Sequence, residues 1–173
     1  MDKIVIFGFS GAGKSTLACR LGKILGIEPT YMDSINWLPG WVEDSNENRI
    51  KKLSPILKRD RWIIERNYKR TLWHERLEKS DTIIFMDINR FKCFYRVVKR
   101  RIQYRGKTRP DMGTGCNEKL DFEFAKWVLI DGRKKRKNYY DIIRSLKNKD
   151  VYIFKNTKHV DEFVKQLERK YKI

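Results

Sequence analysis

The chain has 173 residues and a formal net charge of +18, from 40 Lys and Arg against 22 Asp and Glu. This length suits one domain, which we expect to span residues 1–173. Hydrophobic residues make up 40% of the chain and aromatic residues 13%, which excludes wholesale disorder. No run approaches the roughly 20 apolar residues that cross a bilayer, and the start lacks the pattern of a signal peptide. We therefore expect a cytoplasmic protein without membrane contact.

Short apolar runs alternate with stretches of helical periodicity along the whole chain. In chain order we expect a strand at 3–7, a helix at 17–25, a strand at 29–32, a helix at 45–58, a strand at 62–65, a helix at 70–79, a strand at 82–86, a helix at 91–104, a loop at 106–118, a helix at 121–146, a strand at 151–154 and a helix at 160–171. This alternation predicts an α/β fold with a five-stranded parallel sheet between two helical layers.

A phosphate-binding loop is the strongest motif. Residues 8–15 read GFSGAGKS and match GxxxxGK[ST] between an expected strand and an expected helix. In such loops backbone N–H groups surround the phosphates, the lysine reaches the β- and γ-phosphates, and the hydroxyl ligates Mg²⁺. The sequence therefore predicts a nucleoside triphosphate site formed by Gly8, Ser10, Gly11, Ala12, Gly13, Lys14, Ser15 and Thr16.

The rest of the chain favours a small phosphotransferase over other nucleotide-binding classes. GTPases read guanine with an NKxD segment after a strand, and Asn156–His159 lacks that pattern. A motor ATPase usually needs a longer chain. We therefore expect a kinase with ATP and Mg²⁺ as cofactors.

The chain resembles the DNA topology modulation proteins, the FlaR-related group of adenylate-kinase-like P-loop proteins. The likeness rests on GFSGAGKSTLA at 8–18, YMDSINWLPGW at 31–41, WIIERNYKRT at 62–71, DTIIFMD at 81–87 and RVVKRRIQYRGKTRPDM at 96–112 with Gly115, Cys116 and Glu118. It implies a nucleoside-monophosphate-kinase fold with strand order 2-3-1-4-5 and a basic lid at roughly 96–118. The acceptor of such proteins is generally unassigned.

Three residues near the strand ends gain roles from this resemblance. Asp33 would act as general base or orient Mg²⁺, although a helix cap or turn is the alternative. Glu65 would hold Mg²⁺ through water. Arg66 departs from the family pattern Asp-Gly-Asn-Tyr, because it stands where a glycine is usual. It is either a catalytic cation, as in thymidylate and deoxynucleoside kinases, or the mark of lost acceptor binding.

The expected lid supplies further cations. Arg96, Arg100, Arg105 and Arg109 carry the planar guanidinium that binds two phosphate oxygens, and we expect the last three to be catalytic. Lid closure would exclude water and so favour transfer over hydrolysis. Trp37, Trp41 and Tyr68 form either an aromatic wall for a base or a hydrophobic staple of a mobile loop.

Two basic runs leave a second function open. Residues 88–110 hold nine Lys and Arg without an acid, and 133–137 read RKKRK. The first reading is a kinase that phosphorylates a nucleoside or nucleoside monophosphate. The alternative is a nucleic-acid-binding ATPase that regulates DNA topology, and a kinase of polynucleotide 5′ ends joins the two. Cys19, Cys93 and Cys116 are too widely spaced for a zinc knuckle and are expected to be reduced thiols.

Overall fold

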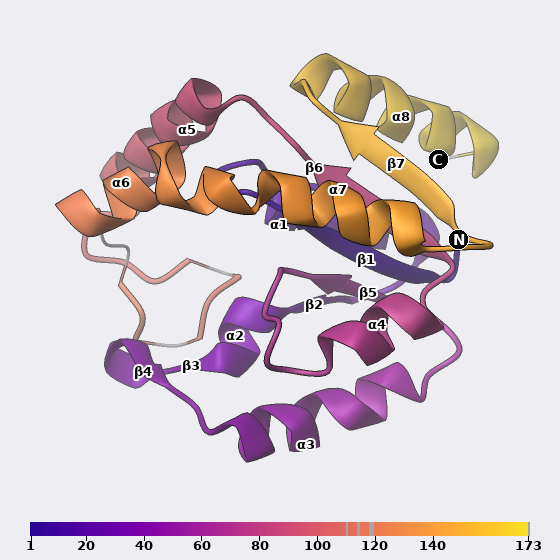
Figure 1. Cartoon of the computed structure of the whole chain (residues 1–173), viewed down its shortest axis with the longest axis horizontal. Helices are drawn as coiled ribbons and strands as arrows, with labels where there is room; N and C mark the ends of the chain where they lie inside the picture. The colour runs from indigo at the N-terminus through magenta and orange to yellow at the C-terminus, as the bar shows by residue number, and fades with distance from the viewer. Residues whose placement is uncertain (110, 114, 118–119, 173) are drawn as a thin grey trace.

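A five-stranded parallel sheet forms the centre of the computed structural model, which describes residues 1–109, 111–113, 115–117 and 120–172 (Figure 1). Its strands are β1 (Lys3–Gly8), β2 (Pro29–Tyr31), β5 (Trp62–Glu65), β6 (Thr82–Met86) and β7 (Asp150–Phe154). They lie in the order β2-β5-β1-β6-β7, which is the expected 2-3-1-4-5. The α/β fold class is therefore confirmed, while the single-domain assignment stays a prediction.

Eight α-helices and a small hairpin complete the described chain. The helices are α1 (Lys14–Leu25), α2 (Met32–Asn36), α3 (Asn46–Leu57), α4 (Trp73–Lys79), α5 (Arg90–Gln103), α6 (Phe122–Leu129), α7 (Arg136–Ser145) and α8 (Thr157–Lys170). The hairpin pairs β3 (Trp37–Leu38) with β4 (Val42–Glu43) across a 3-10 turn at Pro39–Trp41. Within the described ranges, no helix is both long and apolar enough to span a membrane.

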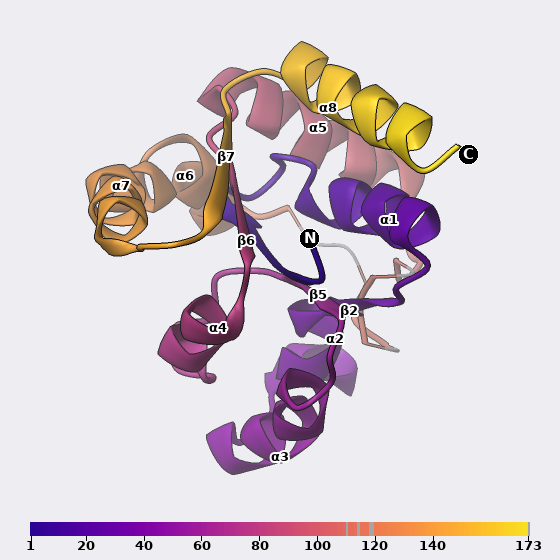
Figure 2. The ribbon, with the colours of Figure 1, turned by 90° about the vertical axis from the view of Figure 1, so that its right-hand side faces the viewer.

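Alternating side chains of the strands divide the core into two layers. Ile4, Ile6 and Ile84 pack against α1, α5 and α8, whereas Val5 and Phe85 pack against α3, α4 and α7. Figure 2 shows these two helical layers on opposite sides of the sheet. Strands buried on both faces read as continuous apolar runs, which explains why the sequence identified them so clearly.

The parallel strands carry the loops of interest at one edge. Backbone pairing places Ile6 of β1 beside Glu65 of β5 and Ile84 of β6. The loops that follow β1 and β5 therefore leave the sheet as neighbours, although about 57 residues separate them along the chain. This edge is where open α/β sheets bind ligands.

Several expected boundaries are wrong. Asp33 does not close a strand, because β2 ends at Tyr31 and Asp33 lies in α2. The helix expected from Arg70 starts at Trp73, since Leu72 has a φ of 48°, which no continuous helix allows. The helix expected at 121–146 divides into α6, a 3-10 segment at Asp131–Lys135 and α7, because Ile130 leaves the helical conformation (φ −126°, ψ −70°).

The hairpin at 37–43 was not expected from the sequence. Its strands contain only two residues each, which is too short for a strand pattern to emerge. Pro110 and Glu118, which belong to the expected lid, lie outside the described residues.

Candidate functional site

The phosphate loop connects β1 to α1 through glycines that no other residue could replace without strain. Gly11 and Gly13 have φ values of 75° and 95°, and Gly8 has 144°. A Cβ on Gly11 would lie 2.3 Å from the Cys93 carbonyl oxygen, and one on Gly8 would lie 2.4 Å from that of Met86. The loop therefore needs glycine both for its backbone angles and for its close approach to β6 and α5.

Lys14 lies at the N-terminus of α1 with only 4% of its surface exposed. Its Nζ donates a hydrogen bond to the Phe9 carbonyl oxygen at 2.9 Å. Burial, followed by repulsion from Arg66, lowers the pKa of Lys14 from 10.5 to about 8, against the opposing effects of Glu65 and Asp33. The ammonium is thus poised to gain from an anionic partner.

A second loop, residues 65–68, follows the neighbouring strand β5; we call it the acceptor segment. Glu65 is 1% exposed, and burial raises the pKa of its carboxyl group. Arg66 forms an ion pair with Asp33, and its Nη1 lies 3.9 Å from Glu65 Oε1. Tyr68 donates its hydroxyl proton to Asp33 Oδ1 at 2.6 Å and accepts a hydrogen bond from Trp37 Nε1 at 2.9 Å.

Asn67 joins the acceptor segment to the phosphate loop. Its Oδ1 accepts from the Gly8 backbone N–H at 3.0 Å, while its Nδ2 donates to the Gly8 carbonyl oxygen at 2.8 Å. The same Nδ2 donates to the Tyr139 hydroxyl at 2.8 Å. One amide side chain therefore fixes the entrance of the phosphate loop against β5 and α7.

Two cavities open at this edge of the sheet and share the four cations Lys14, Arg66, Arg100 and Arg109. The first, which we call the donor cavity, has a volume of about 740 Å³ and is lined by Gly11–Thr16 together with Thr157 and Val160. The second, the acceptor cavity, has a volume of about 700 Å³. Its aromatic lining consists of Trp37, Trp41, Tyr68, Phe124, Trp127 and Tyr139.

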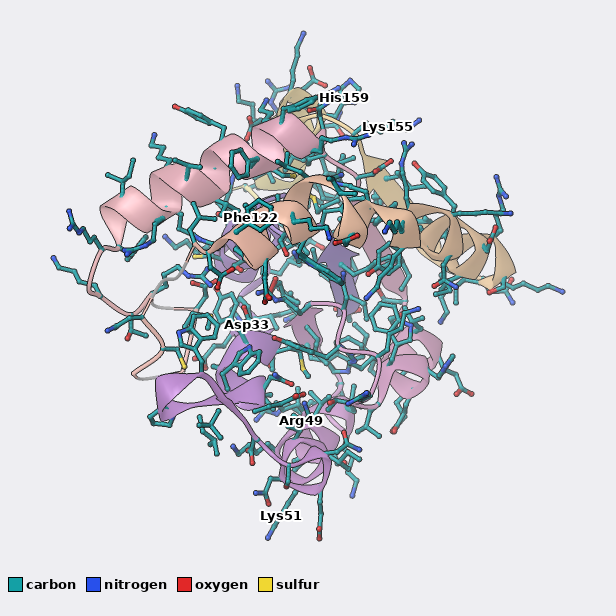
Figure 3. The ribbon with its side chains drawn as sticks, turned by 60° about the vertical axis from the view of Figure 1, so that its left-hand side comes forward. Asp33, Arg49, Lys51, Phe122, Lys155 and His159 are labelled. Atoms are coloured by element: carbon teal, nitrogen blue, oxygen red, sulfur yellow. The ribbon has the colours of Figure 1, made fainter. Side chains whose placement is uncertain are left out.

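The structure brings most of the expected site residues to these cavities, but not all. Gly8 and Ser10 line the acceptor cavity, and Gly11, Ala12, Gly13, Ser15 and Thr16 line the donor cavity. Asp33, Glu65 and Arg105 line neither of the two. Asp33 is 1% exposed in the interior of the molecule, whereas Lys51 projects outward from α3 (Figure 3). Arg105 is exposed.

The hairpin at 37–43 is attached to the loop that follows α5. The Gly40 backbone N–H donates to the Gly115 carbonyl oxygen at 3.1 Å, and Trp41 Nε1 donates to that of Asn117 at 2.8 Å. The buried thiol of Cys116 lies 3.3 Å from the Leu38 carbonyl oxygen. Both tryptophans therefore line the acceptor cavity, and Trp41 also bonds to the loop that follows α5. Their expected contact with a base stays a prediction.

The residues proposed for Mg²⁺ fit such an ion to different degrees. Ser15 lines the donor cavity at the end of the phosphate loop. The Oε1 atom of Glu65 is buried and has no hydrogen-bond partner among the described residues, so it can accept a ligand water. Asp33 fits less well, because Arg66 and Tyr68 already bind its carboxylate. No group of three His, Cys, Asp or Glu side chains in the described ranges forms a metal site.

The basic run 133–137 is less available to an outside partner than its sequence suggests. Arg133 donates to the Ile88 carbonyl oxygen at 2.7 Å, and its guanidinium lies 3.8 Å from the centre of the Phe9 ring. Lys134 pairs with Asp131 at 2.7 Å. Arg136 and Asp87 form a two-pronged ion pair with bonds of 2.7 to 3.0 Å. These cations stabilise the α6–α7 connection.

Sequence reasoning missed Asn67, Arg76, Phe124, Trp127 and Tyr139 as site residues. Asn67 follows Glu65 and Arg66 directly, so its position after a buried strand was an available signal. Arg76 lies on the same helix face as the buried Trp73 and Leu77, which is an unusual place for a cation. Nothing in the sequence indicated that α6 and α7 would reach the site.

No protein-family model matches the chain, and no curated protein matches it in sequence. Solved structures do. Shikimate kinase from Acinetobacter baumannii, in complex with shikimate, has a TM-score of 0.61 at 17% identity over 98% of this chain and 92% of its own. Shikimate kinase from Bacteroides thetaiotaomicron gives 0.55 at 16% identity, with 98% of both chains covered.

A deoxyadenosine kinase from M. mycoides has a TM-score of 0.50 at 16% identity, covering 96% of this chain and 97% of its own. These identities establish a fold and nothing finer. The chain thus shares the α/β fold of these structures, with five parallel strands in the order β2-β5-β1-β6-β7. The comparisons give no support to the resemblance to DNA topology modulation proteins, which stays a prediction.

Proposed function

We propose that the protein is an ATP- and Mg²⁺-dependent kinase that transfers the γ-phosphoryl group to a small acceptor with a planar ring, such as a nucleoside or nucleoside monophosphate. The observation that carries this proposal is the junction of the two cavities at Lys14, Arg66, Arg100 and Arg109. A phosphoryl group passing between two ligands would lie at this junction, where cations offset its charge.

The donor cavity suits a nucleoside triphosphate. Gly11–Thr16 present backbone N–H groups at the N-terminus of α1, whose dipole favours an anion. Thr157 and Val160 at the start of α8 line the same cavity and would contact the base. Arg96 lies over the loop, because its Nη1 donates to the Ala12 carbonyl oxygen at 3.1 Å.

The acceptor cavity suits a planar and polar molecule. Its volume of about 700 Å³ falls in the range of small-ligand sites, which is roughly 300–1,000 Å³. Trp37 and Trp41 meet edge to face with their ring centres 5.5 Å apart and present an aromatic surface. Such a surface favours a ring over an aliphatic acceptor, because stacking adds to apolar burial.

The proposed chemistry is an in-line displacement. An acceptor hydroxyl oxygen forms a bond to the γ-phosphorus while the bond to the bridging oxygen of ADP breaks. Asp33 is the candidate base for the hydroxyl proton. It lines neither cavity, so the step requires that Arg66 release its carboxylate and that the buried side chain become open to the acceptor cavity. Lys14, Arg100 and Arg109 stabilise the charge on the transferred group. Bound Mg²⁺, held through Ser15 and Glu65, would neutralise charge on the phosphates.

The test is ADP release from ATP·Mg²⁺ across nucleosides, nucleoside monophosphates, small hydroxylated metabolites and 5′-hydroxyl oligonucleotides, with Lys14→Ala as the blank. The proposal expects one acceptor to raise the rate well above hydrolysis. Slow hydrolysis that ignores every small acceptor but responds to DNA lacking a free hydroxyl end would overturn it. That outcome would favour a nucleic-acid-binding ATPase instead.

A further inference from the structure

Arg76 is an arginine with no exposed surface. It lies in α4, and burial lowers the pKa of its guanidinium to about 9, with Glu65 opposing that shift. Among the described residues no carboxylate lies within ion-pair distance of it. A buried cation without such a partner is costly, so it calls for a compensating role.

The guanidinium of Arg76 binds the backbone of the acceptor segment at two points. Its Nη2 donates to the Tyr68 carbonyl oxygen at 2.6 Å, and its Nη1 donates to the Arg66 carbonyl oxygen at 3.1 Å. The ring of Trp73 lies 5.0 Å from the guanidinium carbon and supports it from one side. One planar group therefore fixes two carbonyls that are two residues apart.

The backbone that Arg76 holds is strained. Arg66 has a φ of 112°, a conformation that side-chain-bearing residues rarely adopt. Such a conformation persists only where the surroundings enforce it. With this backbone, the Arg66 side chain reaches Asp33, and the Tyr68 hydroxyl meets Asp33 and Trp37.

We propose that Arg76 is a positioning residue for the phosphoryl acceptor: it holds residues 66–68 in the strained conformation that aims Arg66 and Tyr68 at the acceptor cavity. This inference rests on the proposed kinase function. Arg76 acts through backbone carbonyls and lines neither cavity. Arg76 bonds to neither the glycines of the phosphate loop nor Lys14, and the donor cavity depends on the held segment only through Arg66 and through the bonds of Asn67 to Gly8. The donor side should therefore respond less to the loss of Arg76 than the acceptor side.

The first experiment uses three variants of the full chain. Arg76→Met removes every donor at similar side-chain length, and Arg76→Lys keeps the charge. Leu77→Ala removes a buried apolar side chain of the same helix but no hydrogen bond to the segment. We expect Arg76→Met to raise the acceptor KM about tenfold or more, while Kd for ATP·Mg²⁺ stays within about threefold. Arg76→Lys should recover part of the loss, and Leu77→Ala should move neither constant. Equal weakening of donor and acceptor would overturn the proposal.

The second experiment needs no acceptor and so separates this proposal from the kinase assignment. Urea unfolding is measured for Arg76→Met, Arg66→Gly and the double variant. Without Arg76 the strained Arg66 backbone can relax, which returns part of the stability that the lost hydrogen bonds cost, whereas a glycine at residue 66 has no strain to release. Arg76→Met should therefore cost more in the glycine background than in the arginine background, by about fivefold or more in the unfolding equilibrium constant. Both glycine variants lack the ion pair with Asp33, so this pair adds nothing to the cost measured between them. Additive effects would overturn the proposal.

The two experiments can give different answers. The unfolding free energies of Arg76→Met and Arg66→Gly can be non-additive while no acceptor is phosphorylated. That outcome would uphold Arg76 as the holder of this backbone and reject the kinase function on which its positioning role depends. Kinase activity together with additive unfolding free energies would reject the positioning role of Arg76 and leave the kinase function supported.

Discussion

The phosphate loop and the acceptor segment follow neighbouring strands of one sheet, and both leave the ordinary regions of backbone conformation. The phosphate loop does so at glycines, with φ values of 75° at Gly11 and 95° at Gly13. The acceptor segment does so at an arginine, with a φ of 112° at Arg66. The first loop is encoded by its own residues, whereas the second depends on distant groups that hold it.

This difference separates what each loop contributes. The phosphate loop takes its backbone angles from its own glycines, and under the proposed function these glycines would bind the triphosphate. A loop that is held by Arg76 from α4 and by Asn67 against Gly8 ties its shape to the whole fold. Under the proposed function, acceptor recognition would therefore depend on distant contacts more than donor binding does, although Asn67 also ties Gly8 of the phosphate loop to the segment.

The largest expected effect is the loss of the phosphate-loop cation. Lys14→Ala should reduce ATP-dependent transfer by about 10³-fold, because a buried charge at the cavity junction is worth roughly 4 kcal/mol in such sites. Steady-state ADP release with the best acceptor measures it. Lys23→Ala, an exposed lysine at the other end of α1, is the matched control and should be inert. Full activity of Lys14→Ala would show that the site is misplaced.

Substituting glycines tests directly whether the phosphate loop takes its conformation from its own residues. Gly11→Ala should destabilise the protein by about 2–5 kcal/mol, because it adds both a left-handed alanine and an overlap with the Cys93 carbonyl. Gly26→Ala is the control: Gly26 has a similar φ of 65° but nothing within 4 Å of its Cβ position. That substitution should cost only about 1 kcal/mol. Urea unfolding compares the two, and equal costs would contradict the role assigned to close approach.

The contrast between the phosphate loop and the acceptor segment also explains which features the sequence was able to predict. The strands and the phosphate loop followed from apolar runs and a glycine pattern, which are local properties, whereas the strand order was what the resemblance to adenylate-kinase-like proteins implied. The sequence also located the acceptor segment at the end of a buried strand, and it singled out Arg66 as a departure from glycine. It could not give the pairing of Arg66 with Asp33, because the approach of α2 to β5 is set by packing.

Two kinds of residue were beyond local reasoning. Phe124, Trp127 and Tyr139 reach the acceptor cavity only because the helix expected at 121–146 breaks near Ile130 and folds over the sheet edge. Arg133 and Arg136 read as part of a solvated basic run, yet both bind groups of the protein itself. Partners distant in the chain decide such roles, and no pattern of neighbouring residues reports them.

A smaller effect should follow from changing the link between the two loops. Asn67→Asp replaces the amide that donates to the Gly8 carbonyl oxygen at 2.8 Å with a second acceptor. We expect a loss of about 2–3 kcal/mol in unfolding free energy, because a partly buried donor is lost and two oxygens face each other. Asn138→Asp makes the same chemical change beside Lys69 Nζ, which lies 2.7 Å away, and should not destabilise the protein.

The Asn67→Asp experiment also reports on how the loops are coupled. Weaker binding of ATP·Mg²⁺ together with a higher acceptor KM is expected, since Asn67 contacts the phosphate loop directly. If Asn67→Asp bound ATP·Mg²⁺ as tightly as the unchanged protein, the phosphate loop would keep its shape without the hydrogen bond from Asn67 to the Gly8 carbonyl oxygen. The contrast between the two loops would then be stronger than the contacts suggest.

The smallest expected effect is a pH dependence of donor binding. The pKa of Lys14 is about 8 in the folded protein, against 10.5 for an unperturbed lysine. Between these values the unfolded chain binds more protons, so stability of the ligand-free protein should rise with pH. ATP affinity should change in the opposite direction, because the phosphates need the protonated ammonium. With a pKa of about 8, the protonated fraction of Lys14 falls about tenfold from pH 7 to pH 9, and Kd for ATP should rise by the same factor.

Calorimetry of ATP binding in two buffers of different ionisation enthalpy would detect the proton that binding takes up. Lys14→Arg keeps its charge over this range and should flatten the profile, so a slope that persists in that variant would assign the titration to another group.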